Sequence, residues 1–272
     1  MSSATAGTSR GVDVATYHRP HFPPDSSSEE SSTLTAAKTD KYLESRLSHM
    51  EYAADPSLAR GQERANAAGM PKISVSPMQG QFLSVLARGM RAEKILEIGT
   101  LAGYSTTFLA RSLPSHGRID TLEFSPLHAR IAQENFIDSD LYPFPTIHIG
   151  PALDILRDPN GAFASPPGTE EGLPVDERGY DLCFIDADKG GYYGYWLECL
   201  RLTRKGGMII LDNAIQDGRI TLDKNVEGQH DVSGLRKVYD WVKEDGGKTV
   251  LMSGIQTVGG KHWDGFAIAV KL

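Results

Sequence analysis

The pattern of apolar residues changes near residue 93, and the two parts of the chain predict different structures. Before this point, apolar side chains recur at helical spacing, as in Leu43, Leu47 and Met50. After it, short apolar runs alternate with amphipathic segments, which is the pattern of a βαβ series. We therefore expect N-terminal helices over 37–92 and an α/β core over 93–272.

Seven short runs in the core have the length and composition of strands. They cover residues 94–98, 118–123, 146–149, 180–185, 207–211, 249–252 and 266–271. Helices between them are expected to start near Ser105, Ser125, Ala152 and Tyr192, with one more over 235–242. Segment 158–178 reads as a loop insertion, and 253–265 as a Gly-rich connector. The fold class is α/β: a doubly wound, seven-stranded, mostly parallel sheet of Rossmann-like type with extra N-terminal helices.

Residues 1–36 have a different composition from the remainder, with many Ser, Thr, Pro and charged residues. Such a segment buries too little apolar surface to offset its ordering entropy. We expect it to be a disordered tail, or to drape over a subunit or the active site. The remaining residues, 37–272, are expected to form one domain.

Composition and charge narrow the possible partners. The 272 residues are 40% hydrophobic and 23% charged, with a net charge of −7 and no long basic run, which argues against nucleic acid as a partner. No apolar run reaches the roughly 18 residues of a membrane span, and no secretory signal is evident, so a cytoplasmic location is expected. Cys183 and Cys199 lie inside predicted elements, as buried reduced thiols do.

Polar residues follow two of the predicted strands directly. Asp186 comes after the strand at 180–185, and Asp212 and Asn213 come after the strand at 207–211. If these strands are neighbours about 4.8 Å apart, two carboxylates and a carboxamide oxygen converge on one hard cation. Lys189 lies close to the first carboxylate. The pattern predicts an enzyme with a divalent metal and a nearby base.

A glycine loop follows the first strand of the core. Gly99 and Gly103 are spaced G-x-x-x-G, Glu97 lies just upstream, and Glu123 ends the next strand. An acid at the end of the second strand can bind the ribose hydroxyls of a nucleoside. Glu97 repels phosphate and suits a cationic ligand, so the loop favours S-adenosylmethionine over a dinucleotide. The alternative is a purely structural glycine turn next to an acid on the surface, which binds no ligand.

Together these motifs resemble the metal-dependent O-methyltransferases of the caffeoyl-CoA and catechol O-methyltransferase family, which are class I methyltransferases. The resemblance runs from about residue 72 to residue 272 and is carried by SVSPMQGQFL, ILEIGTLAGYS, TLEFSP, GPALDIL, FIDADKGGYYGYW and KGGMIILDN. The DADK and DN motifs on successive strand ends are specific, whereas the glycine loop is shared by many methyltransferases. Val75 stands where the family has a donor-contacting Thr, and the family's aromatic residue shortly after DN is absent.

The resemblance assigns roles to individual residues. The cofactors it implies are S-adenosylmethionine and magnesium, or another divalent cation such as manganese or calcium. The residues that match the metal ligands are Asp186, Asp212 and Asn213. Lys189 matches the general base, and Asp186 belongs with it to the catalytic centre. The donor-binding positions are Val75, Glu97, Gly99, Gly103, Ser105, Glu123, Ala152, Asp186 and Asp188.

The expected function is methylation of one hydroxyl of a small vicinal-dihydroxy aromatic of catechol, caffeoyl or flavonoid type. The family also implies a homodimer. Two alternatives remain at this point: a nucleotide-cofactor oxidoreductase, and an RNA hydroxyuridine O-methyltransferase, which the acidic charge disfavours. An acceptor pocket is one possible place for Tyr192, Tyr193, Tyr195 and Trp196, but residues at helical spacing more often serve packing or a subunit interface, and we expect packing for at least two of them.

Overall fold

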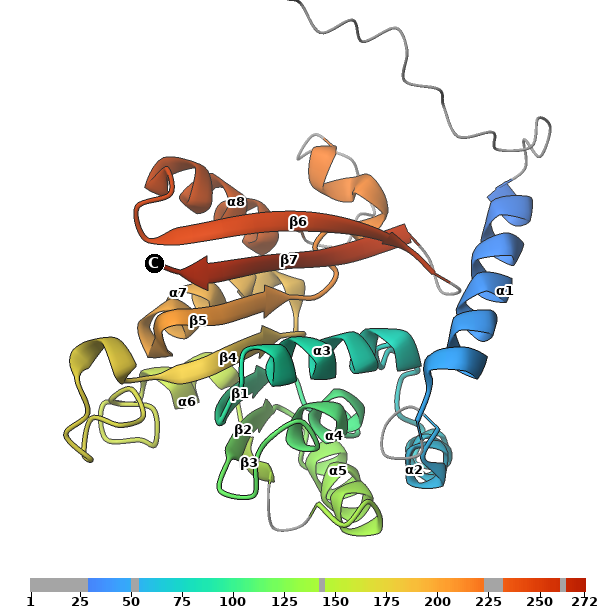
Figure 1. Ribbon diagram of the computed structural model, residues 1–272, viewed down its shortest axis with the longest axis horizontal. Helices are drawn as coiled ribbons and strands as arrows, with labels where there is room; N and C mark the ends of the chain where they lie inside the picture. The colour runs from blue at the N-terminus through green and yellow to red at the C-terminus, as the bar shows by residue number, and fades with distance from the viewer. Residues whose placement is uncertain (1–28, 50–53, 142–144, 223–231, 260–262) are drawn as a thin grey trace, which may run out of the picture.

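A seven-stranded sheet forms the centre of the molecule (Figure 1). The computed structural model describes residues 29–49, 54–141, 145–222, 232–259 and 263–272. The sheet order is β3-β2-β1-β4-β5-β7-β6. The strands are β1 (Lys94–Ile98), β2 (Arg118–Glu123), β3 (Pro145–Ile149), β4 (Tyr180–Ile185), β5 (Thr203–Leu211), β6 (Val250–Val258) and β7 (Trp263–Lys271).

The order of the strands reverses between β1 and β4. β1 pairs in parallel with β2 on one side and with β4 on the other, whereas β7 is antiparallel to both β5 and β6. In open α/β sheets, ligands bind beyond the carboxyl ends of the strands at such a reversal. The predicted mostly parallel, doubly wound sheet is confirmed, and its topology places a binding site beyond β1 and β4.

Helices cover both faces of the sheet (Figure 1). One face carries α3 (Pro77–Gly89), α4 (Tyr104–Ala110) and α5 (Pro126–Asp138), and the other carries α6 (Ala152–Arg157), α7 (Tyr192–Leu202) and α8 (Ser233–Asp245). Alternate residues of β4 enter the two layers: Leu182 and Phe184 face the first group, and Cys183 and Ile185 face the second. All of β4 is buried, which explains why its residues are apolar apart from Asp181.

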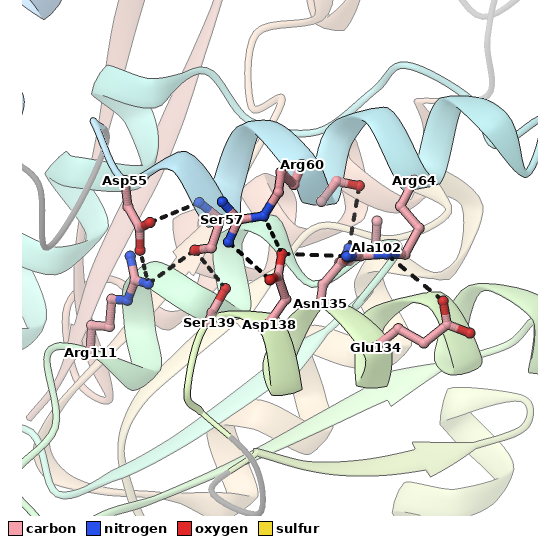
Figure 2. Close-up of polar contacts among 11 residues, drawn as sticks. Asp55, Ser57, Arg60, Arg64, Ala102, Arg111, Glu134, Asn135, Asp138 and Ser139 are labelled. Atoms are coloured by element: carbon pink, nitrogen blue, oxygen red, sulfur yellow. Dashed lines mark hydrogen bonds and ion pairs between the residues drawn. The ribbon is translucent and has the colours of Figure 1, made fainter.

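The N-terminal helices α1 (Glu29–Leu47) and α2 (Pro56–Ala67) lie outside these layers. Polar side chains fasten α2 to α5 (Figure 2). Arg60 donates to both carboxylate oxygens of Asp138, at 3.0 and 2.9 Å. Asp55 caps the first turn of α2 and forms an ion pair with Arg111. Because α2 leads directly into residues 71–76, this contact fixes the segment that borders the binding cleft.

The last two strands differ from the sequence-based expectation. Segment 253–265, predicted to be a Gly-rich connector, is largely strand, because β6 and β7 pair from Val250–Lys271 through to Val258–Trp263. β6 is an edge strand whose side chains are mostly exposed. Its residues are held by backbone hydrogen bonds to β7 and need no apolar pattern. Composition therefore did not predict this strand.

The N-terminal boundary also shifts. α1 begins at Glu29, so residues 29–36 of the expected tail are helical; residues 1–28 lie outside the described part. The insertion at 158–178 is a loop with one short 3-10 helix, η2 (Val175–Glu177), as expected. Both cysteines are buried and free. Of the helices that the structure describes, none is long and apolar enough to cross a membrane.

Candidate active site

A cleft of about 1250 Å³ opens beyond the carboxyl ends of β1, β2 and β4. One wall is the segment that joins α2 to α3, including Val75, and another is the 3-10 helix η4 (Gln216–Thr221). The predicted site residues that line it are Val75, Gly99, Ser105, Glu123, Ala152, Asp186, Asp188, Lys189 and Asn213. Residues that are far apart in the sequence therefore meet in one cavity.

The glycine loop brings the backbone of β1 against that of β4. Gly99 has a φ of +107°, and a Cβ atom there would lie 2.0 Å from the carbonyl oxygen of Asp186. Gly103 has a φ of +79°, and its Cβ atom would collide with the Phe136 ring. Only glycine satisfies both the conformation and the space. The close approach joins the donor loop directly to the strand end that carries Asp186.

Glu97 lies beneath the loop rather than on the cleft surface. Its carboxylate is fully buried and accepts hydrogen bonds from the hydroxyls of Ser105, Thr106 and Thr121 at 2.6, 2.5 and 2.6 Å. Burial raises the pKa of Glu97 to about 7, and the three hydroxyls oppose that shift. Among the described residues that line the cleft, neither Glu97 nor Gly103 appears. Direct contact of either residue with a ligand stays a prediction.

Glu123, at the end of β2, is fixed by three donors. The backbone N–H groups of Leu101 and Ser125 donate to its two oxygens at 2.7 and 2.9 Å, and His128 Nδ1 lies 3.2 Å from Oε1. The carboxylate is nearly buried yet lines the cleft, and its contact with a ligand stays a prediction. His128 also lines the cleft; the sequence signalled it only by its place in the first turn of α5.

Asp188 begins the 3-10 helix η3 (Lys189–Gly191). One of its oxygens accepts from the N–H of Gly191 at 2.8 Å, and the other accepts from the Tyr195 hydroxyl at 2.5 Å. Tyr195 itself lines the cleft. Tyr195 is therefore one of the aromatic residues of α7 that do more than pack, because its hydroxyl holds a predicted donor-binding carboxylate in place.

The metal-ligand candidates lie at the ends of neighbouring strands. Ile185 of β4 and Leu211 of β5 are register partners, so Asp186 and Asp212 follow at the same level of the sheet. Asp212 is 4% exposed, and its pKa is raised by burial and then by the charge of Asp186. A buried carboxylate beside a second, partly exposed carboxylate is costly unless a positive charge accompanies them. The structure thus confirms the adjacency that the sequence predicted.

Lys189 supplies the nearby cationic side chain. Its Nζ donates to Asp186 Oδ1 at 3.1 Å and to the Tyr192 hydroxyl at 2.7 Å. The Tyr192 hydroxyl in turn lies 3.0 Å from the carbonyl oxygen of Asp212 and donates to it. Tyr192 is fully buried, and burial raises its pKa well above the ordinary value, so it stays neutral. Tyr192 therefore links the lysine to both strand ends.

A second cavity of about 310 Å³ lies on the far side of Asp212 and Asn213. Its walls are mainly apolar and come from the start of α3, from β6 and from β7. Val75, Met78, Phe82, Val258 and Phe266 are among the residues that line it. The two cavities share Val75, Asn213 and Asp264 among other residues, so the metal-ligand candidates stand between a large cleft and a smaller pocket.

The fold and this two-part site define a class I methyltransferase, and comparisons with known proteins agree. The family model described as "O-methyltransferase" matches residues 49–257. The chain belongs to the O-methyltransferase family, and its activity is S-adenosylmethionine-dependent methyl transfer to oxygen. The comparisons favour neither the oxidoreductase nor the RNA-modifying alternative.

Two bacterial relatives carry the name catechol O-methyltransferase. The one from Niastella koreensis is 42% identical over 85% of this chain and 95% of its own length, and the one from Mycobacterium tuberculosis is 38% identical over 85% and 94%. Among solved structures, an O-methyltransferase from Bacillus cereus in complex with S-adenosylhomocysteine is 35% identical. Its TM-score is 0.75, and the match covers 88% of this chain and 100% of the Bacillus cereus chain.

Proposed function

We propose that this methyltransferase acts with a divalent cation on one hydroxyl of a small aromatic compound that carries two vicinal hydroxyls. The observation that carries the proposal is the register of β4 and β5, which makes Asp186 and Asp212 neighbours; Asp186 lines the larger cleft and Asp212 the smaller pocket. The relatives named catechol O-methyltransferase support the acceptor class.

The side chains at the two strand ends fit a hard cation. Asp186, Asp212 and Asn213 offer only oxygen ligands, the type that magnesium, manganese and calcium prefer. The described part of the chain has no group of three His, Cys, Asp or Glu side chains that could hold a metal. A set of two carboxylates and one carboxamide suits an ion that completes its shell with water and with substrate oxygens, as magnesium does. When bound, the cation would supply positive charge that favours the ionised form of an acceptor hydroxyl.

Lys189 is the proposed base. Its Nζ is held between Asp186 and the neutral Tyr192 hydroxyl, so its position is set before the acceptor arrives. In the neutral form, Nζ would take the proton from the acceptor hydroxyl. The oxygen then forms the C–O bond while the S–C bond of the donor breaks and its electron pair stays on sulfur. Placing these groups in line can contribute roughly 7–11 kcal/mol.

The donor is assigned to the larger cleft. Glu123 would bind the ribose hydroxyls, and Asp188 the amino group of the methionine part. Val75, Gly99, Ser105 and Ala152 supply the remaining lining. The smaller apolar pocket beyond Asp212 and Asn213 is the proposed place of the acceptor ring. Reaction of an anion with a sulfonium cancels charge, and the buried surroundings of Asp212 favour that change.

A homodimer and a cytoplasmic location are two further proposals. The homodimer expected from the family resemblance has the N-terminal helices as its candidate contact surface. The cytoplasmic location rests on the sequence alone.

The function is tested with labelled S-adenosylmethionine and a panel of acceptors: catechol, a caffeoyl ester, a flavonoid diol and phenol. Each is assayed with magnesium and with chelator. We expect methylation of the vicinal diols only with magnesium, and phenol to react about 100-fold more slowly because a single oxygen is not aligned. Equal rates for phenol and catechol would contradict the proposed acceptor class.

A further inference from the structure

Asp264, on β7, is a buried carboxylate with an unusual set of partners. It is 4% exposed. Its Oδ1 accepts from the backbone N–H groups of Ile215, Gln216 and Gly265 at 3.0, 2.9 and 2.9 Å. Its Oδ2 accepts from the side-chain amide of Asn213 at 2.9 Å. One carboxylate therefore holds both the side chain of a proposed metal ligand and the backbone that follows it.

The contact with Asn213 decides which way the amide is turned. A carboxylate only accepts hydrogen bonds, whereas a carboxamide has a donating nitrogen and an accepting oxygen. The nitrogen of Asn213 must therefore face Asp264, and its oxygen is left for another partner. Because only the oxygen can bind a cation, the orientation imposed from β7 is the one that a metal ligand needs.

The backbone contacts hold a segment that would otherwise be unfavourable. Asn213, Gln216 and Asp217 have φ angles of +50°, +52° and +52°, which residues other than glycine seldom adopt. Asp264 binds the N–H groups of two residues within this stretch, and the N–H of Ala214 donates to the carbonyl of Gly265 at 2.9 Å. β7 thus fixes the turn as well as the amide.

We propose that Asp264 is a positioning residue for the cation site: it binds the amide nitrogen of Asn213 and the turn behind it, so that the Asn213 oxygen is presented to the metal. The inference rests on the proposed function, because it assumes that Asn213 is a ligand. It assigns a role to a residue 51 positions further along the chain that does not itself bind the ion.

The first test is Asp264→Asn, measured by manganese binding to the donor-free protein with electron paramagnetic resonance. The variant side chain still accepts from the backbone, but it places an amide nitrogen opposite the nitrogen of Asn213. We expect the dissociation constant for manganese to rise about 10- to 100-fold, as is usual when a partner of a metal ligand is changed. Unchanged binding by a folded Asp264→Asn protein would overturn the inference.

A swapped pair separates orientation from general damage. Asn213→Asp combined with Asp264→Asn restores one donor and one acceptor across the contact. We expect the double variant to bind manganese at least about tenfold more tightly than Asp264→Asn alone, because the carboxylate at 213 accepts from the new amide and keeps an oxygen for the metal. If the double variant binds no better than Asp264→Asn, orientation is not the role of Asp264.

Asp181→Asn is the matched control. Asp181 is also buried and accepts from two backbone N–H groups, those of Glu93 and Lys94 at 2.7 and 2.8 Å, but it lies at the opposite end of β4. We expect a lower melting temperature with unchanged manganese affinity. Equal weakening in both variants would reduce the role of Asp264 to stability. Absence of manganese binding in the wild-type protein would instead overturn the proposed function, which keeps the two failures apart.

Discussion

The two ends of the active site are built in opposite ways. At the donor end, the carboxylates of Glu97 and Glu123 each accept three hydrogen bonds or close polar contacts from hydroxyl, amide or imidazole groups of the chain. At the proposed metal end, Lys189 forms an ion pair with Asp186, and the neighbouring Asp212 has a raised pKa. The donor end is preorganised by neutral dipoles, whereas the metal end concentrates negative charge that a cation would balance. We therefore expect substitutions at the two ends to affect different quantities, donor affinity at one end and metal-dependent turnover at the other.

Asp212→Ala should have the largest effect and should leave the donor end intact. Loss of a carboxylate ligand removes several kcal/mol of charge stabilisation, which corresponds to a fall in turnover of about 1,000-fold or more. Labelled-donor assays with magnesium measure the turnover, and calorimetry with S-adenosylmethionine measures the donor affinity, which we expect to change little. A variant that loses donor binding and turnover in parallel would contradict the separation of the two ends.

The pH dependence of stability should report on Glu97. Its pKa rises from 4.5 to about 7 in the folded protein, so the folded state holds this proton more tightly than the unfolded state does. The stability from this group is fully present below pH 4.5 and is lost as pH rises through about 7, a change of about 3 kcal/mol. Urea unfolding at several pH values, for the wild type and for Glu97→Gln, measures the difference. Parallel pH profiles in the two proteins would show that Glu97 is not the group responsible.

Glu123→Ala should weaken donor binding without changing the affinity for the metal. A hydrogen bond to a charged group contributes about 1.5–3 kcal/mol, so the dissociation constant for S-adenosylmethionine should rise about 10- to 100-fold. Manganese binding, measured in the same preparation, is expected to be unchanged and serves as the control. Donor affinity equal to that of the wild type would remove Glu123 from the proposed ribose site.

Asp55→Ala tests the support that both ends share, and it should have the smallest effect. Loss of the cap of α2 is expected to lower the free energy of unfolding by about 1 kcal/mol, with turnover at saturating substrates unchanged. Asp55→Asn keeps a capping oxygen but loses the charge that pairs with Arg111, so denaturant unfolding of both variants separates the two contributions. A large loss of turnover in Asp55→Ala would mean that α2 shapes the site more directly than its position indicates.

The parts of the fold that the sequence predicted well are those whose side chains carry the pattern. β1, β2 and β4 have the predicted bounds, because most of their residues are buried and their apolar positions mark each strand in the sequence. β6 was missed in large part because its residues are exposed and its pairing depends on backbone groups. The pattern of apolar residues reports burial, so it does not identify a strand that lies exposed at the edge of the sheet.

The candidate site divides in a similar way. Asp186, Asp212 and Asn213 could be predicted because each follows a strand directly, and neighbouring strand ends must meet. Tyr192 and Asp264 could not, since one resembles a packing residue and the other contacts Asn213 across 51 positions. Such contacts depend on tertiary structure and leave no local signal. Glu97 was expected to face a ligand, yet its burial beneath the loop depends on hydroxyls of α4 and β2.

The most direct test of the proposed mechanism is a magnesium titration of chelator-treated enzyme, with saturating labelled S-adenosylmethionine and catechol. We predict no methylation in chelator and a saturable return of full turnover as magnesium is added. The Asp212→Ala variant should show no return at the same concentrations. Full turnover of the wild-type protein in chelator would contradict a metal-dependent mechanism at the ends of β4 and β5.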